Sequence, residues 1–183
     1  MTRRCDVAIV GGGIGGLTLA ASLLRQSISV EIFEQDTELR EIGAGVAIAG
    51  NATRLLERLG IDLTQAANIP PTLEFRRWSD GGLLWSHPIG EWYRQEVGAP
   101  YVELHRRTLQ HLLAAAVPLE CIRLDHRLVG LSDESAGVRL HFANGGEVVA
   151  GVVAGADGVH SALQTCMGAV DLRPCADAGL GAD

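Results

Sequence analysis

Short apolar runs and a cluster of glycines dominate the beginning of the chain. Val7–Val10 is an uninterrupted apolar run of strand length, and the sequence GGGIGG follows it at residues 11–16. Leu17–Leu24 then places apolar residues on one helical face, and Ser29–Phe33 predicts a second strand that ends at Glu34. The order of strand, glycine turn, helix, strand and acid predicts a βαβ unit.

This order is typical of an adenine dinucleotide site. Gly11 permits the tight turn out of the strand, Gly13 leaves room for a pyrophosphate, and Gly16 lets the helix pack closely on the sheet. The helix N-terminus offers N–H groups and a partial positive charge to the phosphates. Glu34 can accept hydrogen bonds from ribose hydroxyls, which disfavours the 2′-phosphate of NADP. NAD and FAD remain as candidates, and the alternative is a glycine turn that only packs.

A second glycine-rich turn, at residues 43–46, precedes a predicted helix. Its glycines would let the backbone lie against a flat ligand, although the turn could equally be only structural. Asn51 is the predicted N-cap of this helix, and Gly60 closes it. One face of the helix is expected to carry Leu55, Leu56 and Leu59.

Beyond Pro70-Pro71 the pattern changes to short strands and one further helix. The expected elements are strands at 73–78 and 83–85, a helix at 108–116, and a hairpin of 138–142 with 148–154 around Asn144-Gly145. We expect the three tryptophans to lie in the core or on a sheet face rather than against a substrate; they are Trp78, Trp85 and Trp92.

Composition narrows the possible partners. The 183 residues carry a net charge of −7, and all 15 basic residues are Arg, which argues against nucleic acid. The uncharged stretch Val7–Leu24 resembles a membrane span in length, but five of the six residues from 11 to 16 are glycine, which disfavours a continuous helix. We therefore expect no membrane association.

The four cysteines, at positions 5, 121, 166 and 175, lack metal-binding spacing. They are expected to be the reduced thiols of a cytoplasmic protein, with a Cys166–Cys175 disulfide as the alternative. No metal site is expected.

Three later segments occur in a fixed order: LREIGAGVAIAGNATRLLERLGI at 39–61, YVELHRRTLQ at 101–110 and GADGVHS at 155–161. Together with the glycine motif they resemble the FAD-dependent aromatic hydroxylases, the single-component flavoprotein monooxygenases that include the salicylate and hydroxybenzoate hydroxylases. The resemblance covers roughly residues 5–165. The chain departs from the family pattern at Gly50, where Pro is usual, and at Gln164, where Arg is usual.

The resemblance implies a set of FAD-binding residues: Gly11, Gly13, Ile14, Gly16, Glu34, Gln35, Arg40, Ala44, Gly45, Val46, Arg106, Leu128 and Asp157. It implies that Arg106 reaches FAD from the start of its helix and that Leu128 offers backbone to the adenine. It associates Asp157 with both FAD and NAD(P)H. Judged from the residues alone, Arg106 could equally be a solvated charge, and Asp157 could cap a turn before the helix-like segment that begins at Ser161.

The family fold is α/β, with a Rossmann-like FAD-binding domain that starts as βαβ and contains a mixed sheet. The resemblance places this discontinuous domain at residues 1–70 and 101–165 and the beginning of a β-sheet substrate domain at 71–100. Residues 166–183 show no periodicity and are rich in Ala, Gly and Asp, so an irregular tail is expected there. Family members continue for roughly as long again, with most of the substrate pocket in that second half. The chain is therefore expected to be a truncated form that lacks the C-terminal half of the family fold.

The implied function is hydroxylation of a small aromatic substrate with FAD as cofactor, NADH or NADPH as co-substrate, and O₂. A chain of this length is expected to be a poor catalyst, and no catalytic residue can be named from it. The alternatives are a non-catalytic FAD- or dinucleotide-binding module and another flavin oxidoreductase of the same superfold. Substrate identity and oligomeric state stay open.

Overall fold

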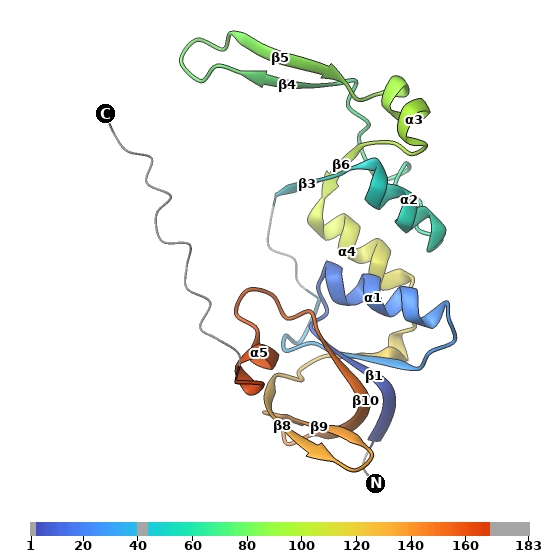
Figure 1. Cartoon of the computed structure of the whole chain (residues 1–183), viewed down its shortest axis with the longest axis vertical. Coiled ribbons are helices and arrows are strands. Elements are labelled where there is room, and N and C mark those ends of the chain that lie inside the picture. Colours follow the sequence, from blue (N-terminus) through green and yellow to red (C-terminus); the bar gives the residue numbers. More distant parts are fainter. Residues whose placement is uncertain (1–2, 40–43, 169–183) are drawn as a thin grey trace.

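The structure, a computed structural model, describes residues 3–39 and 44–168 of the chain. Within these residues the central sheet has six strands, which from edge to edge are β7 (Ile122–Arg123), β2 (Val30–Phe33), β1 (Arg3–Val10), β10 (Glu147–Gly155), β9 (Gly137–Phe142) and β8 (Leu128–Glu134) (Figure 1). The other described elements are α1 (Ile14–Leu24), β3 (Gly45–Ile48), α2 (Gly50–Arg58), β4 (Thr72–Arg76), β5 (Leu83–Pro88), α3 (Glu91–Val97), β6 (Val102–His105), α4 (Arg106–Ala115), the 3₁₀ helix η1 (Leu119–Cys121) and α5 (Ala162–Cys166).

The βαβ unit that the sequence predicts forms the centre of this sheet. Strand β1 leads through the glycine loop into α1, and β2 then returns parallel to β1. Strands β10 and β7 also run parallel to their neighbours β1 and β2, whereas β9 is antiparallel to both β10 and β8. Every residue of β2 is buried, as expected for a parallel strand with both faces covered. The Rossmann-like, mixed-sheet fold class is thereby confirmed.

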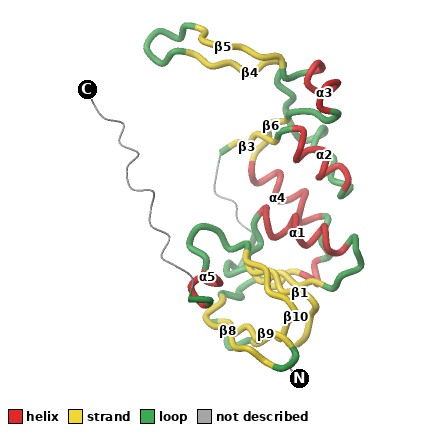
Figure 2. Tube along the Cα trace, in the orientation of Figure 1, coloured by secondary structure: helices red, strands yellow, loops and turns green. Residues whose placement is uncertain are grey.

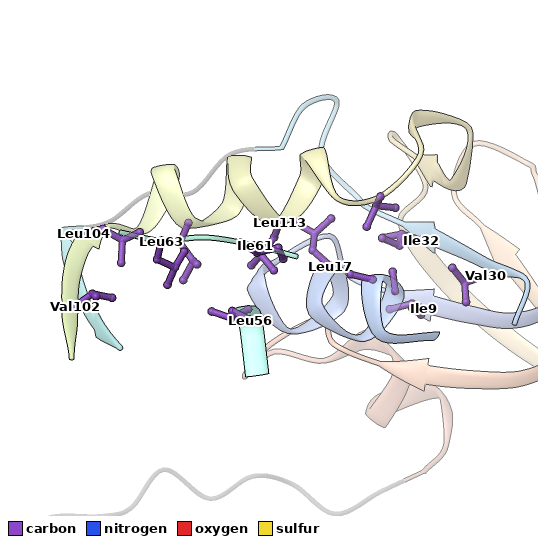
Figure 3. Close-up of a cluster of buried hydrophobic side chains, with 14 residues drawn as sticks. Ile9, Leu17, Val30, Ile32, Leu56, Ile61, Leu63, Val102, Leu104 and Leu113 are labelled. Atoms are coloured by element: carbon purple, nitrogen blue, oxygen red, sulfur yellow. The ribbon is translucent and has the colours of Figure 1, made fainter. Parts of the chain in front are cut away.

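Helices α1 and α4 cover one face of the sheet and lie side by side (Figure 2). Between them and the strands, Ile9, Leu17 and Leu113 are completely buried (Figure 3). Burying each of these side chains stabilises the fold by about 2 kcal/mol. The same cluster continues to Leu56 of α2 and Val102 of β6, so one core joins the βαβ unit to segments far along the chain.

The opposite face of the sheet has a second core, which contains aromatic rings. The rings of Phe33 and Phe142 stack with their centroids 4.8 Å apart, and His126 packs edge-on against Phe142. Leu140 and Leu163 complete this cluster, the latter from α5. The second core therefore fixes the ends of β2, β8 and β9 close to the segment that follows β10.

Glu31 is a carboxylate buried within β2, with 8% of its surface exposed. It accepts hydrogen bonds from Arg3 at 2.5 Å and from Arg123 at 3.3 Å, so its charge is paired from both neighbouring strands.

Burial, and secondarily the charge of Glu31, raises the pKa of the Cys5 thiol to about 11. Cys5 and Cys121 are free thiols, and so is the exposed Cys166. The alternative partner of Cys166, at position 175, lies outside the described residues.

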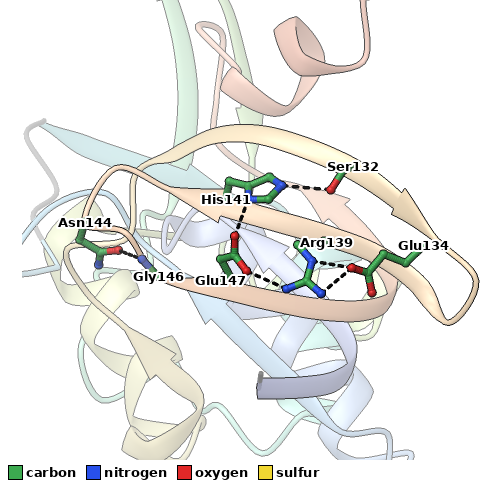
Figure 4. A network of polar contacts seen from close by, with 7 residues as sticks. All are labelled: Ser132, Glu134, Arg139, His141, Asn144, Gly146 and Glu147. Atoms are coloured by element: carbon green, nitrogen blue, oxygen red, sulfur yellow. Dashed lines mark hydrogen bonds and ion pairs between the residues drawn. The ribbon is translucent and has the colours of Figure 1, made fainter. Parts of the chain in front are cut away.

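The predicted hairpin around Asn144-Gly145 is confirmed as β9 and β10. Gly145 has a φ of +82°, a conformation that favours glycine, and Gly146 N–H donates to Asn144 Oδ1 at 2.8 Å. The strand residues beside this turn carry a network of charged side chains (Figure 4).

In that network Arg139 binds two carboxylates from neighbouring strands. Arg139 Nη1 donates to Glu147 at 2.7 Å, and its Nε donates to Glu134 at 2.5 Å. His141 Nδ1 lies 3.0 Å from Glu147 Oε1, and its Nε2 lies 3.0 Å from the Ser132 hydroxyl. Hydrogen bonds from Arg139, with a smaller contribution from His141, hold the pKa of Glu147 below its ordinary value.

Helix α2 follows β3, which pairs antiparallel with β6. The prediction of Asn51 as its N-cap is wrong, because the helix already begins at Gly50 and Ala49 occupies the N-cap position without a side-chain bond. Tertiary packing explains why the first helical residue is glycine, because a Cβ on Gly50 would lie 2.8 Å from the carbonyl oxygen of Ala99. The predicted apolar face is also wrong for Leu55, which is 56% exposed.

Strands β4 and β5 form a hairpin at the end of the molecule opposite the N-terminus (Figure 1). Phe75 and Trp85 are cross-strand partners on one face of it, with ring centroids 5.4 Å apart, and both are exposed. The expectation of a core or sheet-face position is wrong for Trp78, which is 96% exposed in the turn beyond the last paired residues. It is also wrong for Trp92, which is exposed on helix α3. This hairpin has an aromatic face that its neighbours do not cover.

Among the described helices, none is long and apolar enough to span a membrane. The uncharged stretch noted in the sequence is divided between β1 and α1 by the glycine loop. Within the same residues, no three His, Cys, Asp or Glu side chains come together in a group that could hold a metal ion.

Candidate dinucleotide site

The glycine loop connects the end of β1 to the start of α1. Gly11 has a φ of +107°, and a Cβ there would lie 2.4 Å from the carbonyl oxygen of Ala156. A Cβ on Gly16 would lie 2.0 Å from the carbonyl oxygen of Gly11. Both contacts are with backbone, so neither position accepts a side chain without movement of the chain. The loop therefore lies close to both α1 and the end of β10.

The N-terminus of α1 is open to an anionic ligand. Its N-cap, Gly13, provides no side chain, and the first turn has no acidic residue. The first N–H groups of a helix lack intrahelical acceptors and carry partial positive charge. This geometry is the one that binds phosphate groups at helix N-termini in dinucleotide folds.

Glu34, the acid at the end of β2, lies beside the same loop. Its Oε2 accepts a hydrogen bond from Gly12 N–H at 2.6 Å, and its Oε1 accepts one from Asp36 N–H at 3.1 Å. The backbone of Glu34 is anchored as well, because its N–H donates to the carbonyl of Arg123 and its carbonyl accepts from His126 N–H. The carboxylate is thereby held at the edge of the loop.

A cavity of about 340 Å³ opens in front of the glycine loop. Its lining consists of Val10, Gly11, Gly13, Ile14, Gly15, Phe33, Glu34, Gln35, Arg106, His126, Arg127, Leu128, Ala156, Asp157, Gly158 and Ala162. The volume falls in the range of small-molecule pockets. Two arginines and two acidic residues belong to this wall, so it can attract phosphates and also bind hydroxyl groups.

The cavity brings together eight of the predicted cofactor residues: Gly11, Gly13, Ile14, Glu34, Gln35, Arg106, Leu128 and Asp157. Gly16 is buried where α1 meets the sheet. Ala44, Gly45 and Val46 lie at the start of β3 and are not part of this lining. They are nevertheless connected to it, because Arg106 N–H donates to the Ala44 carbonyl at 3.3 Å. Arg40 lies outside the described residues.

Asp157 makes local hydrogen bonds in addition to lining the cavity. Its Oδ1 accepts from the Ser161 hydroxyl at 2.7 Å, and its Oδ2 accepts from Leu163 N–H at 3.1 Å. Ser161 in turn caps α5 by accepting from Gln164 N–H at 3.0 Å. The turn-capping alternative raised from the sequence therefore describes the contacts that Asp157 makes within the chain.

Sequence reasoning missed several lining residues: Val10, Gly15, Phe33, His126, Arg127, Ala156, Gly158 and Ala162. Most are direct neighbours of predicted positions. His126 and Arg127 lie in the loop before β8, and only the tertiary fold brings this loop beside Glu34, through the hydrogen bond from His126 N–H to the Glu34 carbonyl at 2.8 Å. No local signal in the sequence marks that approach.

The residues fit an adenine dinucleotide. Glycine occupies the positions where a Cβ would strike neighbouring backbone, in the loop itself or after β10. An uncapped helix N-terminus faces the cavity, and a carboxylate closes the adjacent strand. These are the parts that hold the pyrophosphate and the ribose in the Rossmann fold.

Comparison with known proteins agrees with this geometry. The chain is 42% identical over 164 residues to a 3-amino-4-hydroxybenzoate 2-monooxygenase of Streptomyces platensis, with 88% of this chain and 41% of that protein covered. It is 33% identical to a 6-hydroxynicotinate 3-monooxygenase of Bordetella bronchiseptica, with 90% and 43% covered. The chain thus spans about two-fifths of the length of these curated relatives.

A solved structure shares the fold. A variant of HpxO from Klebsiella pneumoniae, crystallised with FAD, superposes with a TM-score of 0.80 at 20% identity, covering 91% of this chain and 43% of that one. The family described as FAD binding domain matches residues 4–173, which is most of the sequence. The chain belongs to this FAD binding domain family.

Proposed function

We propose that this chain binds FAD in the cavity before the glycine loop and corresponds to the FAD-binding portion of an NAD(P)H- and O₂-dependent aromatic monooxygenase. The observation that carries the proposal is the convergence of the glycine loop, Glu34 and Arg106 on one cavity at the N-terminus of α1. The family match and the monooxygenases among the relatives support it.

The diphosphate of FAD would lie against the N-terminus of α1, where Gly11, Gly13 and Ile14 line the wall. Glu34 would bind the adenosine ribose, and Gln35 lies next to it in the same wall. Each oxygen of the Glu34 carboxylate accepts a hydrogen bond from backbone, and a carboxylate has about four acceptor sites in all. Ribose hydroxyls can therefore bind without breaking the contact that holds Glu34 to the loop.

The flavin end would extend toward the start of β3. Gly45 and Val46 form that start, and Ala44 directly precedes it. The backbone N–H of Arg106 donates to the Ala44 carbonyl. We propose that Arg106 and this strand together approach the flavin side of the cofactor, with Arg40 from the preceding segment. Leu128, buried at the start of β8, would offer backbone to the adenine at the other end.

Asp157 would act through the turn that it stabilises. Its hydrogen bonds to Ser161 and Leu163 fix the segment around Gly158, which lines the cavity. Bound FAD would supply hydride acceptance from NAD(P)H and activation of O₂. The protein contributes binding, orientation and exclusion of water, and no side chain of the described residues is assigned a catalytic step.

The names of the relatives support a proposal for the substrate class. They are named for 3-amino-4-hydroxybenzoate and 6-hydroxynicotinate, which are small hydroxylated aromatic acids. We propose a substrate of this class for the complete activity. Because the chain spans about two-fifths of these relatives, we propose little turnover by this chain alone.

The test begins with a titration of the 183-residue chain with FAD, followed by flavin fluorescence. Glu34→Ala should weaken FAD binding at least about tenfold, because hydrogen bonds to a charged group are worth about 1.5–3 kcal/mol. Glu57→Ala, which removes an exposed carboxylate from α2, should leave the affinity unchanged. A folded Glu34→Ala variant with wild-type affinity would contradict the proposed site.

Turnover is measured separately, as NADH and NADPH consumption with 3-amino-4-hydroxybenzoate or 6-hydroxynicotinate. We expect FAD binding without substrate-dependent consumption. Rapid consumption coupled to hydroxylated product would overturn the proposal of little activity alone. Binding of NAD in place of FAD would show a dinucleotide module of another kind.

A further inference from the structure

Gln110 is a polar residue buried in the core beneath the glycine loop. Only 2% of its surface is exposed, and it lies on α4 between buried apolar neighbours such as Leu109 and Leu113. Its side-chain amide nitrogen donates to the carbonyl oxygen of Gly12 at 3.3 Å. The residue thereby connects α4 to a loop that lies 98 positions earlier in the sequence.

The side-chain amide oxygen of Gln110 does not connect α4 to the loop in this way. Within the described residues, its Oε1 is buried and accepts no hydrogen bond. The amide cannot be reversed to correct this, because the carbonyl of Gly12 can only accept. An unpaired buried acceptor is unfavourable, and an apolar side chain would avoid it. Among the residues that the structure describes, the hydrogen bond to Gly12 is therefore what distinguishes Gln110 from an apolar core residue.

Gly12 is held at both of its backbone polar groups. Its N–H donates to Glu34 Oε2 at 2.6 Å, and its carbonyl accepts from Gln110. In a trans peptide the C=O of one residue and the N–H of the next point in opposite directions. The bond from Gln110 therefore directs the N–H of Gly13 away from α4, and Gly13 lines the cavity.

We propose that Gln110 is a positioning residue for the cofactor diphosphate. By holding the Gly12 carbonyl, it orients the Gly13 N–H so that this group can donate to a phosphate oxygen before the ligand arrives. A preorganised donor binds more tightly than one that must be ordered on binding. This inference rests on the proposed FAD binding, and it assigns a role to a residue outside the cavity wall.

The experiment compares FAD affinity in Gln110→Met and Leu113→Ala variants of the full chain. Gln110→Met keeps a similar size but lacks the donor, and we expect FAD to bind about tenfold more weakly. Leu113→Ala disturbs the same buried face of α4 without a hydrogen bond to the loop. It should lower thermal stability but change the affinity of the folded protein less than about twofold.

A ³¹P NMR spectrum of bound FAD provides a readout that stability alone does not move. The two diphosphate resonances should shift in Gln110→Met and stay in place in Leu113→Ala. If Gln110→Met does not fold, Gln110→Asn serves instead, since it keeps the amide but is one methylene too short to reach Gly12. In the unmodified chain, the side-chain amide protons of Gln110 should be protected from exchange and should shift as FAD is added.

The outcomes separate this inference from the proposed function. Failure of the unmodified chain to bind FAD would contradict both the proposed function and the role of Gln110. Normal FAD binding with wild-type affinity in Gln110→Met, or unchanged ³¹P resonances, would overturn the role of Gln110 and leave the proposed function in place. The role of Gln110 would also be overturned if its side-chain amide protons exchange rapidly with solvent and their resonances do not shift when FAD is added. This test holds even if no variant folds.

Discussion

At the scale of the residue, the glycines of one motif are required for different reasons. Gly11 adopts a positive φ and lies against the backbone that follows β10. Gly16 has an ordinary helical position, but a Cβ there would strike the Gly11 carbonyl at 2.0 Å. A Cβ on Gly15, directly beside it, would meet no other group within 4 Å, so this position has no such constraint. The motif combines a conformational demand with a packing demand.

A pair of alanine substitutions tests this difference. Gly16→Ala should destabilise the chain by about 1–3 kcal/mol, because α1 must move away from the loop to admit the methyl group. Gly15→Ala should leave stability unchanged or raise it by up to about 1 kcal/mol through helix propensity. Urea unfolding of both variants provides the comparison, and equal stability of the two would show that α1 does not pack closely against the loop.

At the scale of the element, the outer edge of the central sheet is held by charge as well as by backbone pairing. Arg139 of β9 lies between Glu134 of β8 and Glu147 of β10, so three strands meet at one guanidinium group (Figure 4). His141 adds a second partner for Glu147. These side chains are partly exposed, so salt screens their interaction, and pairs of this kind contribute modestly.

Because of this network, part of the free energy of unfolding depends on pH in the acid range. Arg139 first, and then His141, keep the pKa of Glu147 below its ordinary 4.5, so the folded state favours the carboxylate more than the unfolded state does. The resulting stability is present above pH 4.5 and is lost as the pH falls through the lowered pKa. Glu147→Gln should therefore show a shallower loss of urea stability below that pH than the wild type.

The matched control is Glu96→Gln, which removes an exposed carboxylate from α3, outside the network. This variant should follow the wild-type pH profile. If Glu147→Gln loses urea stability below pH 4.5 as steeply as the wild type does, the network does not stabilise the sheet edge.

At the scale of the whole molecule, apolar surface is distributed unevenly. The central sheet packs helices against one face and has a second core, with aromatic rings, on the other. The β4–β5 hairpin, at the far end, exposes Phe75 and Trp85 on one face, and Trp92 follows on α3. His87 lies between the two indoles, with ring centroids 5.4 Å from Trp85 and 5.0 Å from Trp92. Contiguous exposed apolar surface of this kind binds other apolar surfaces.

An environment-sensitive hydrophobic dye should report this face. The double substitution Phe75→Thr with Trp85→Thr should lower dye fluorescence on the order of twofold while the melting temperature stays nearly constant, since these rings are outside both core clusters. Trp78→Thr removes an equally large indole that is isolated at the turn and should change dye binding little. Equal loss of fluorescence in both variants would contradict a single aromatic face.

Much of the fold could be predicted locally because its signals are local. The strand before Gly11, the helix after Gly16 and the turn at Asn144-Gly145 follow from apolar periodicity and from residues that tolerate positive φ. The errors have different origins. Asn51 lies inside α2 rather than before it, and the preceding Gly50 packs against the distant Ala99, where a Cβ would lie 2.8 Å from the carbonyl oxygen. Trp78 is exposed for a local reason, because it lies in the turn beyond the paired strands.

The sequence by itself determined the βαβ order and the chemistry of the site: glycines where the chain must turn, and an acid at the end of the next strand. Only the tertiary structure decided which groups share the cavity. The loop with His126 and Arg127 reaches the site through the hydrogen bond from His126 N–H to the Glu34 carbonyl, and the segment after β10 reaches it through the pairing of β10 with β1. Gln110 reaches the glycine loop from beneath, through α4. Periodicity reports the environment of one element, whereas contacts between elements depend on how all of them pack.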